Sequence, residues 1–454
     1  MSSQLPRVAA LIALCGISIG AAAQCARFPA SASSAFDAKE GKITLPWRTD
    51  LPASAGSKTY AWQGKDFTVD WQAYMEAVLN EVKASGVAIS GGRISMKPQA
   101  EWWIAPWMDF GSSGRERING LTAERGPDPH DLAPNSSGGY ETWAIGWYNQ
   151  PGAYGLGQVY VDACDPKVPP GWRFADQTAS FKLLFSNART SEVSYLVGAP
   201  EVEADTKRSS NPDATTKLKL IQVDIAVRDP GAKETGWVMG TFVWRGPPKG
   251  DGFFDNLVPV GLMWGNDPKA VVDDWSASAP IMQSKINGAL AGVTWQGTGQ
   301  AWPERPFPGF QGRLNGPADN VRSSCLSCHA MAQWRRGPLG LTPTYKLDPK
   351  PKPERVRALV DDYFRNTMGG SLVDPASGQT PLDYSLQLEA ALIRLCDACE
   401  QEKLSGPTPQ VCKAPKVRAR DVVITRPSCE KNVLQKLMFL FSPKESELSN
   451  LPRQ

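Results

Sequence analysis

The most restrictive feature of this sequence is the stretch Cys325–His329, which reads CLSCH. A C-x-x-C-H run is the attachment site of a c-type haem. Two cysteines at this spacing lie on one side of a helical turn, where both sulfurs can reach the vinyl groups of one porphyrin, and the histidine becomes the proximal ligand of the iron. With 9 Cys and 2 His in 454 residues, roughly 0.0008 such matches are expected by chance. We therefore predict one covalent haem c, held by Cys325 and Cys328 with His329 on the iron.

Three simpler interpretations compete with haem attachment. The cysteine pair could be half of a zinc site, a redox dithiol, or a structural disulfide beside an incidental histidine. Zinc needs two more soft ligands, and the only other histidine, His130, is far upstream. A thioredoxin-type dithiol lies at a strand-to-helix junction, which the pattern does not show here. His130 itself, between Pro129 and Asp131, is expected to be a loop histidine.

The N-terminus has the pattern of a secretory signal peptide. Met1–Arg7 carries one positive charge, Val8–Gly20 is an apolar run too short to span a bilayer as a helix, and three alanines supply a cleavage site before Gln24. We expect residues 1–23 to be removed and the mature chain, without a transmembrane segment, to be periplasmic. Stable thioether attachment of haem is extracytoplasmic in bacteria, so this pattern and the CLSCH motif support each other.

Besides the motif pair and Cys15 in the predicted signal peptide, the chain has six further cysteines, and an oxidising compartment favours disulfides for them. Six cysteines allow 15 pairings, and the sequence alone does not choose among them. Four of the six cluster near the C-terminus, namely Cys396, Cys399, Cys412 and Cys429, so we expect two disulfides there. A Cys25–Cys164 bridge is a further candidate. A four-cysteine zinc site is the alternative. Glu400 follows the second C-x-x-C pair, so that pair is not another haem site.

Length and patterning predict an α+β protein of two domains. The expected order is a flexible leader over 24–44, an antiparallel β-rich domain over 45–300, a Gly/Pro-rich linker over 301–318, and a mostly helical haem domain over 319–454 with a disulfide-stapled C-terminal extension. The net charge of +3 is too small to favour nucleic acid or a membrane surface as a partner.

Hydrophobic periodicity predicts the individual elements. Asp70 can cap a helix over 71–84, and Gly86 can end it. Alternating apolar and polar residues over 218–228 and 236–244 predict an antiparallel hairpin. We also expect strands over 158–162 and 180–186, and helices over 353–367, 383–398 and 431–441. Asp319 or Asn320 can cap the helix that carries the motif.

The segment from about 312 to 400 resembles a class I domain of the cytochrome c family. Such domains place C-x-x-C-H at the end of an opening helix and close with a C-terminal helix, here the predicted helix over 383–398. The resemblance implies that the motif cysteines form the thioethers and that His329 is the proximal ligand. It also implies a methionine ligand from a loop before the last helix, where Met368 stands, although no proline follows it. Met331, on the same turn as the histidine, should not reach the far face.

A second resemblance concerns the β-rich part. The strings Phe181–Phe185 (FKLLF), Asp224–Asp229 (DIAVRD) and Gly236–Gly240 (GWVMG), all upstream of the motif, are similar to β-sheet cytochromes of the c-prime-beta type. Those proteins close on their haem motif near the C-terminus, and some oxidise small nitrogen compounds. This chain departs from that plan because more than a hundred residues follow His329. The likeness is therefore one of fold rather than of site.

These features predict an electron-transfer protein, because an exported domain with a single haem most often has that role. A methionine ligand would fill the sixth position and raise the reduction potential of the iron. If the sixth position is open, the alternative is a haem enzyme or small-ligand sensor whose β-rich domain shapes the pocket. The basic run Lys346–Arg357 could steer an acidic redox partner, although a solvated face also explains it. The aromatic run Trp102–Trp107 could line a pocket, although a core explains it too. The sequence supports neither a hydrolase nor a kinase.

Overall fold

The structure is a computed structural model, which describes residues 36–38, 41–43, 47–48, 50–104, 115–133, 136–162, 165–207, 214–250, 252–274, 277–290, 309–334, 352–400 and 408–413. Several predicted features lie outside these residues, namely the signal peptide over 1–23, the Cys25–Cys164 bridge, Cys429 and the helix over 431–441.

Strands outnumber helices in the part of the chain that the structure describes. The helices are α1 (Trp71–Ala84), α2 (Gln150–Val159), α3 (Cys325–His329), α4 (Pro353–Tyr363) and α5 (Leu386–Glu400). The strands are β1 (Phe36–Ala38), β2 (Gly41–Ile43), β3 (Ala88–Ser90), β4 (Arg93–Ser95), β5 (Trp102–Ile104), β6 (Thr122–Glu124), β7 (Thr142–Asn149), β8 (Ala179–Ser186), β9 (Glu201–Ala204), β10 (Thr216–Arg228), β11 (Trp237–Trp244), β12 (Leu257–Met263), β13 (Ser284–Ile286), β14 (Gln333–Trp334) and β15 (Thr380–Pro381).

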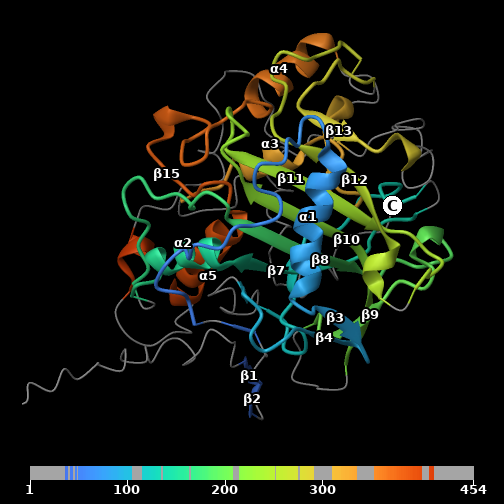
Figure 1. Ribbon diagram of the computed structural model, residues 1–454, viewed down its shortest axis with the longest axis vertical. Coiled ribbons are helices and arrows are strands. Elements are labelled where there is room, and N and C mark those ends of the chain that lie inside the picture. The colour runs from blue at the N-terminus through green and yellow to red at the C-terminus, as the bar shows by residue number, and fades with distance from the viewer. Residues whose placement is uncertain are drawn as a thin grey trace, which may run out of the picture.

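One antiparallel sheet forms the centre of the described structure (Figure 1). Its strands follow the order β13-β12-β11-β10-β8-β7-β5, with β6 paired to β7 and β9 paired to β10. The short strands β1–β2, β3–β4 and β14–β15 form three separate pairs. The predicted antiparallel β-rich part is therefore confirmed. Within the segment predicted as a flexible leader, β1 and β2 pair with each other.

The strand register sorts side chains onto two faces, because directly paired residues point to the same side of a sheet. Lys182 of β8 pairs with Gly146 of β7 and with Asp224 of β10, which in turn pairs with Thr241 of β11. The side chain of Gln387 from α5 lies 2.3 Å from the place that a Cβ on Gly146 would take. Helix α5 therefore covers this polar side, which we call the motif face.

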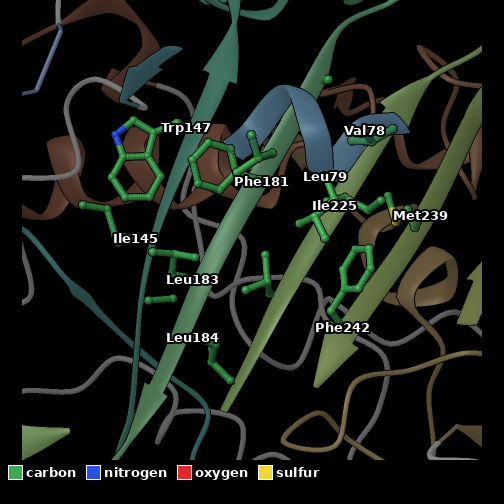
Figure 2. Close-up of a cluster of buried hydrophobic side chains, with 14 of the residues drawn as sticks. Val78, Leu79, Ile145, Trp147, Phe181, Leu183, Leu184, Ile225, Met239 and Phe242 are labelled. Carbon is green, nitrogen blue, oxygen red and sulfur yellow. The ribbon is translucent and has the colours of Figure 1, made fainter. Parts of the chain in front are cut away.

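The opposite face is apolar, and α1 covers it. Phe181, Ile225 and Gly240 share this face by the same pairing, and the methyl carbon of Met75 lies 3.0 Å from the place of a Cβ on Gly240. Figure 1 shows α1 lying across the strands, and Figure 2 shows part of the buried cluster. There Trp147 stacks on Phe181 with ring centroids 4.9 Å apart. Helix α1 thus covers the apolar face of the sheet, and α5 covers the motif face.

Several predicted elements are confirmed. Helix α1 spans the predicted 71–84, and its cap Asp70 accepts a hydrogen bond from the Ala73 amide at 3.0 Å. Gly86 follows the helix with a φ of +70°, the left-handed conformation that glycine adopts without strain. Strands β10 and β11 form the predicted hairpin, and β8 covers the predicted strand over 180–186.

The strand predicted over 158–162 is wrong. Residues up to Val159 belong to α2, because Asn149 caps that helix and Pro151 lies in its first turn, where its missing N–H is not needed. Helix α4 ends at Tyr363 rather than at residue 367, and α5 begins at Leu386 rather than at 383.

The hydrophobic core joins the sheet to the segment that carries the motif. One cluster of buried side chains contains Val223 of β10 together with Leu326 of α3 and Leu392 of α5. The described end of the Gly/Pro-rich segment is also packed, since Phe310 and Leu314 are fully buried. Leu314 and Leu326 therefore hold the motif segment against the sheet, while Phe310 packs in a second cluster with Val356 and Val360 of α4.

One of the disulfides expected near the C-terminus is present in the described chain. Cys396 of α5 is bonded to Cys412, which removes both from a possible zinc site. No helix among the described residues has the length and apolar character needed to cross a bilayer.

Candidate haem site

Helix α3 begins at Cys325 because two serines form a capping box. The Ser324 hydroxyl accepts a hydrogen bond from the Ser327 amide at 3.0 Å, and the Ser327 hydroxyl accepts one from the Ser324 amide at 2.9 Å. The predicted caps Asp319 and Asn320 are therefore wrong. A cap must immediately precede the first helical residue, and both of these lie in the preceding turn.

Arg313 and Asn266 tie the start of α3 to the loop after β12. The Ser324 hydroxyl donates to the Asn266 side-chain oxygen at 2.7 Å. The fully buried Arg313 guanidinium donates to the carbonyl oxygens of Asn266 at 2.7 Å, Asp267 at 2.9 Å and Ala270 at 2.7 Å. Burial lowers the pKa of Arg313 to about 10, so the side chain is still a cation at neutral pH.

The His329 imidazole is oriented by one backbone carbonyl. Its Nδ1 lies 2.9 Å from the carbonyl oxygen of Tyr384. A carbonyl oxygen only accepts, so Nδ1 carries the proton and Nε2 keeps its lone pair. Burial lowers the pKa of His329, which favours the neutral imidazole that binds metals. The ring is therefore prepared to bind an iron through Nε2.

A cavity of about 230 Å³ lies between the motif and the sheet. Cys325, Cys328 and His329 all line it, and neither cysteine is bonded in a disulfide. The structure thus brings the three predicted haem residues to one wall. The other walls include Tyr148, Ser180, Lys182, Leu184, Asp224, Ala226, Trp237 and Met239 from the sheet, and Gln387, Ala390 and Arg394 from α5.

A charged cluster forms part of the sheet wall. The Lys182 ammonium lies 3.2 Å from Asp224 and 3.6 Å from Glu124, and the Gln222 amide donates to Asp224 at 3.0 Å and to Asp319 at 3.2 Å. Burial acts to lower the pKa of Lys182, but the surrounding carboxylates outweigh it and the pKa is raised. Burial, reinforced by the charge of Asp224, raises the pKa of Asp319. Lys182 is therefore a stable cation, and Asp319 holds a proton more readily than an exposed carboxyl.

These residues fit a c-type haem. Two thiols and an imidazole with a free Nε2 on one wall are the groups that thioether attachment and axial ligation require. Arg125 also lines the cavity. Its Nη2 pairs with Asp128 at 2.6 Å, while its buried Nη1 has no hydrogen-bond partner among the described residues. A guanidinium nitrogen of this kind suits an anionic group, and the propionates of haem are carboxylates.

The structure does not bring Met368 to the cavity wall. Its side chain is 42% exposed, and its sulfur lies 3.6 Å from the place of a Cβ on Gly236, at the turn between β10 and β11. Among the described residues, the methionine that lines the cavity is Met239 of β11. Register places Met239 opposite Ala226, on the motif face.

The other candidates from the sequence lie away from the cavity. His130 is exposed in a loop at a φ of +70°, as a loop histidine should be. Trp102 is 2% exposed and belongs to the core, as predicted. Of the basic run, Lys346 and Lys350 lie outside the described residues. Arg357 pairs with Asp273 at 2.8 Å.

The sequence pattern indicated neither the charged cluster nor Met239. Lys182 and Asp224 are charges inside otherwise apolar strands, which is the available signal, but a solvent-facing strand shows the same alternation. In the part of the chain that the structure describes, no group of three or more His, Cys, Asp or Glu side chains is placed to hold a metal ion alone.

Comparisons with known proteins identify no relative of this chain. It matches no protein-family model, no curated protein and no solved structure.

Proposed function

We propose that this protein is an exported c-type haem protein with one haem c, bonded through Cys325 and Cys328 and ligated by His329. The cavity supports this, because both thiols and the oriented imidazole share one of its walls. In this proposal the helical part after residue 318 carries the haem, and the motif face of the sheet completes the pocket. The Cys396–Cys412 disulfide and the signal-peptide pattern favour the periplasm, since disulfides persist in oxidising compartments.

We further infer that the iron keeps a position open for a small molecule, which makes the protein a haem oxidoreductase or a small-ligand sensor. When bound, haem would supply a redox-active iron. The chain itself would supply a lasting positive charge at the cavity from Lys182 and a carboxyl that holds a proton readily from Asp319. Met368 does not line the cavity and its side chain is 42% exposed, which favours this function over electron transfer through Met368.

Electron transfer is the second candidate, and Met239 is the observation that favours it. Its side chain lines the cavity, so a thioether is available there without moving Met368. A methionine ligand would raise the reduction potential and close the iron to other ligands. The protein would then exchange electrons with a redox partner, for which an acidic surface would suit the basic residues near α4.

Haem attachment is tested first, by producing the chain with a periplasmic haem-attachment system and measuring its intact mass. The wild-type protein should gain the mass of one haem and show a Soret band. The double variant Cys325→Ala/Cys328→Ala should lose the covalent haem, while Met331→Ala, a change outside the cavity wall, should keep it. A wild-type protein without added mass would overturn the proposal.

Carbon monoxide then separates the two functions. If the iron is open, the reduced protein binds carbon monoxide readily, and neither Met239→Ala nor Met368→Ala changes its spectrum. If a methionine binds the iron, the oxidised protein shows the far-red methionine–iron band. Loss of that band in only one of the two variants then identifies the ligand. If the reduced protein binds carbon monoxide and the band is missing, the enzyme or sensor is supported. If the reduced protein does not bind carbon monoxide, the electron carrier is supported.

A further inference from the structure

The chain turns sharply just before α5, at a corner formed by Asp383 and Tyr384. Both residues have positive φ angles, +44° and +68°. Non-glycine residues rarely adopt this region, and two in succession are strained. Such a corner persists only when its surroundings hold it in place. The carbonyl oxygen at this corner, that of Tyr384, is the one that accepts from His329 Nδ1.

The Asp383 side chain is the main link between this corner and the sheet. Its carboxylate accepts hydrogen bonds from the Trp237 indole at 2.9 Å and from the Phe174 amide at 2.7 Å. The Arg228 guanidinium lies 3.5 Å away. Asp383 is 2% exposed, so water does not compete for these bonds. Trp237 begins β11 and Arg228 ends β10, which places the anchor at the end of the hairpin.

Two further bonds hold the corner from its other sides. The Tyr384 hydroxyl donates to the carbonyl oxygen of Thr367 at 2.6 Å. The amide of Leu382 donates to the carbonyl oxygen of Ala332, just after α3, at 3.1 Å. The corner is therefore held to the sheet, to the residues just after α3 and to the residues just after α4.

We propose that Asp383 is a positioning residue through which the β10–β11 hairpin sets the orientation of the His329 imidazole. This inference rests on the proposed function, in which that imidazole binds the iron. Asp383 does not touch the iron or the porphyrin in this role. It holds the backbone so that the Tyr384 carbonyl stays in line with Nδ1.

The physical effect of this arrangement is on the strength of the histidine as a ligand. A firm hydrogen bond from Nδ1 to a carbonyl raises the basicity of the imidazole and fixes its tautomer. A more basic ligand stabilises the oxidised iron, which lowers the reduction potential. Loosening the corner should therefore raise the potential and lower the frequency of the iron–histidine stretch.

Three substitutions separate the backbone from the side chain. Asp383→Asn tolerates positive φ but loses one of the two accepted hydrogen bonds, because its amide nitrogen only donates. Asp383→Gly permits the corner and removes both bonds. Asp383→Ala removes both bonds and disfavours the corner. The upward shift in potential should be smallest for Asn and largest for Ala.

Asp229→Asn is the matched control. Asp229 is also a buried carboxylate, and it accepts from the Tyr74 hydroxyl of α1 at 2.8 Å. Its loss should lower stability without moving the potential or the stretching frequency. If the Asp383 variants fold, carry haem and match Asp229→Asn in both measurements, the inference is overturned.

A haem-free measurement keeps the inference independent of attachment. The chain has 2 His, so nitrogen NMR of the Cys325→Ala/Cys328→Ala protein resolves His329 beside His130. His329 should show the single tautomer protonated at Nδ1, and adding Asp383→Ala should give a mixture of tautomers. An unchanged single tautomer would refute the positioning role even if haem attachment holds. A wild-type protein without haem, by contrast, would refute the proposed function. The NMR result alone would then decide whether Asp383 positions the His329 imidazole.

Discussion

Replacing Arg313 with methionine removes a buried cation that holds the segment before α3. The Arg313 side chain is fully buried, and its guanidinium donates to three carbonyl oxygens at 2.7–2.9 Å. It also lies over the Phe364 ring, 4.6 Å from the centroid. Methionine fills much of the same volume without a charge or a donor. The change therefore isolates the polar part of the interaction.

Two opposing effects set the size of the change. Hydrogen bonds from a charged donor contribute about 1.5–3 kcal/mol each, so the loss of three costs about 6 kcal/mol. Methionine also removes the cost of burying the cation, which the lowered pKa of about 10 puts at about 3 kcal/mol. The lost hydrogen bonds are the larger effect. We expect Arg313→Met to lower the free energy of unfolding by about 3 kcal/mol.

The assay is urea unfolding followed by tryptophan fluorescence. Arg313→Lys should be at least as damaging as Arg313→Met, because lysine keeps the buried charge and satisfies fewer carbonyls. Arg357→Met is the surface control. The Arg357 side chain is 63% exposed beside Asp273, and its loss should cost less than about 1 kcal/mol. A cost below about 1 kcal/mol for Arg313→Met, or a lysine variant more stable than the methionine one, would refute the reasoning.

Three further expectations concern stability and pH. Gly309→Ala places a Cβ 2.1 Å from a main-chain carbonyl oxygen, whereas Gly288→Ala meets nothing within 4 Å; calorimetry should show a loss of about 1–3 kcal/mol for the first alone. Burial raises the pKa of Asp131 to about 6 from 3.8, so this group stabilises the fold fully below about pH 4. That contribution, up to about 3 kcal/mol, is lost as pH rises through 6, and Asp131→Asn should gain stability relative to wild type between pH 4 and 7. Replacing Cys396 and Cys412 by serine opens a loop with a sequence separation of 16 and should cost about 3 kcal/mol in chemical unfolding; an unchanged midpoint would argue against that pairing.

The sheet was predictable where local pattern decides it. Alternation identified β10 and β11, and Asp70 and Gly86 bounded α1. The pattern could not tell that both sides of the hairpin are covered, because Gln222 and Asp224 look like solvent-facing residues. The structure covers the side of these two residues with α5 and the motif segment. Only contacts between distant parts of the chain distinguish a buried polar face from an exposed one.

The candidate site was predictable in its motif but not in its surroundings. Cys325, Cys328 and His329 were identified because their spacing has a chemical meaning. Asp383 gave no signal, since its importance lies in a backbone conformation that sequence does not display. Met368 was selected for its position along the chain, whereas Met239 reaches the wall through strand register.

The order of the sheet and the motif along the chain has a consequence for maturation. In the described structure every strand of the central sheet precedes Cys325. A chain translocated from its N-terminus delivers all of these strands to the destination compartment before the cysteines arrive. The sheet can then assemble first and act as a template for the motif segment and α5, which arrive later and, in the proposed function, would enclose the haem against it.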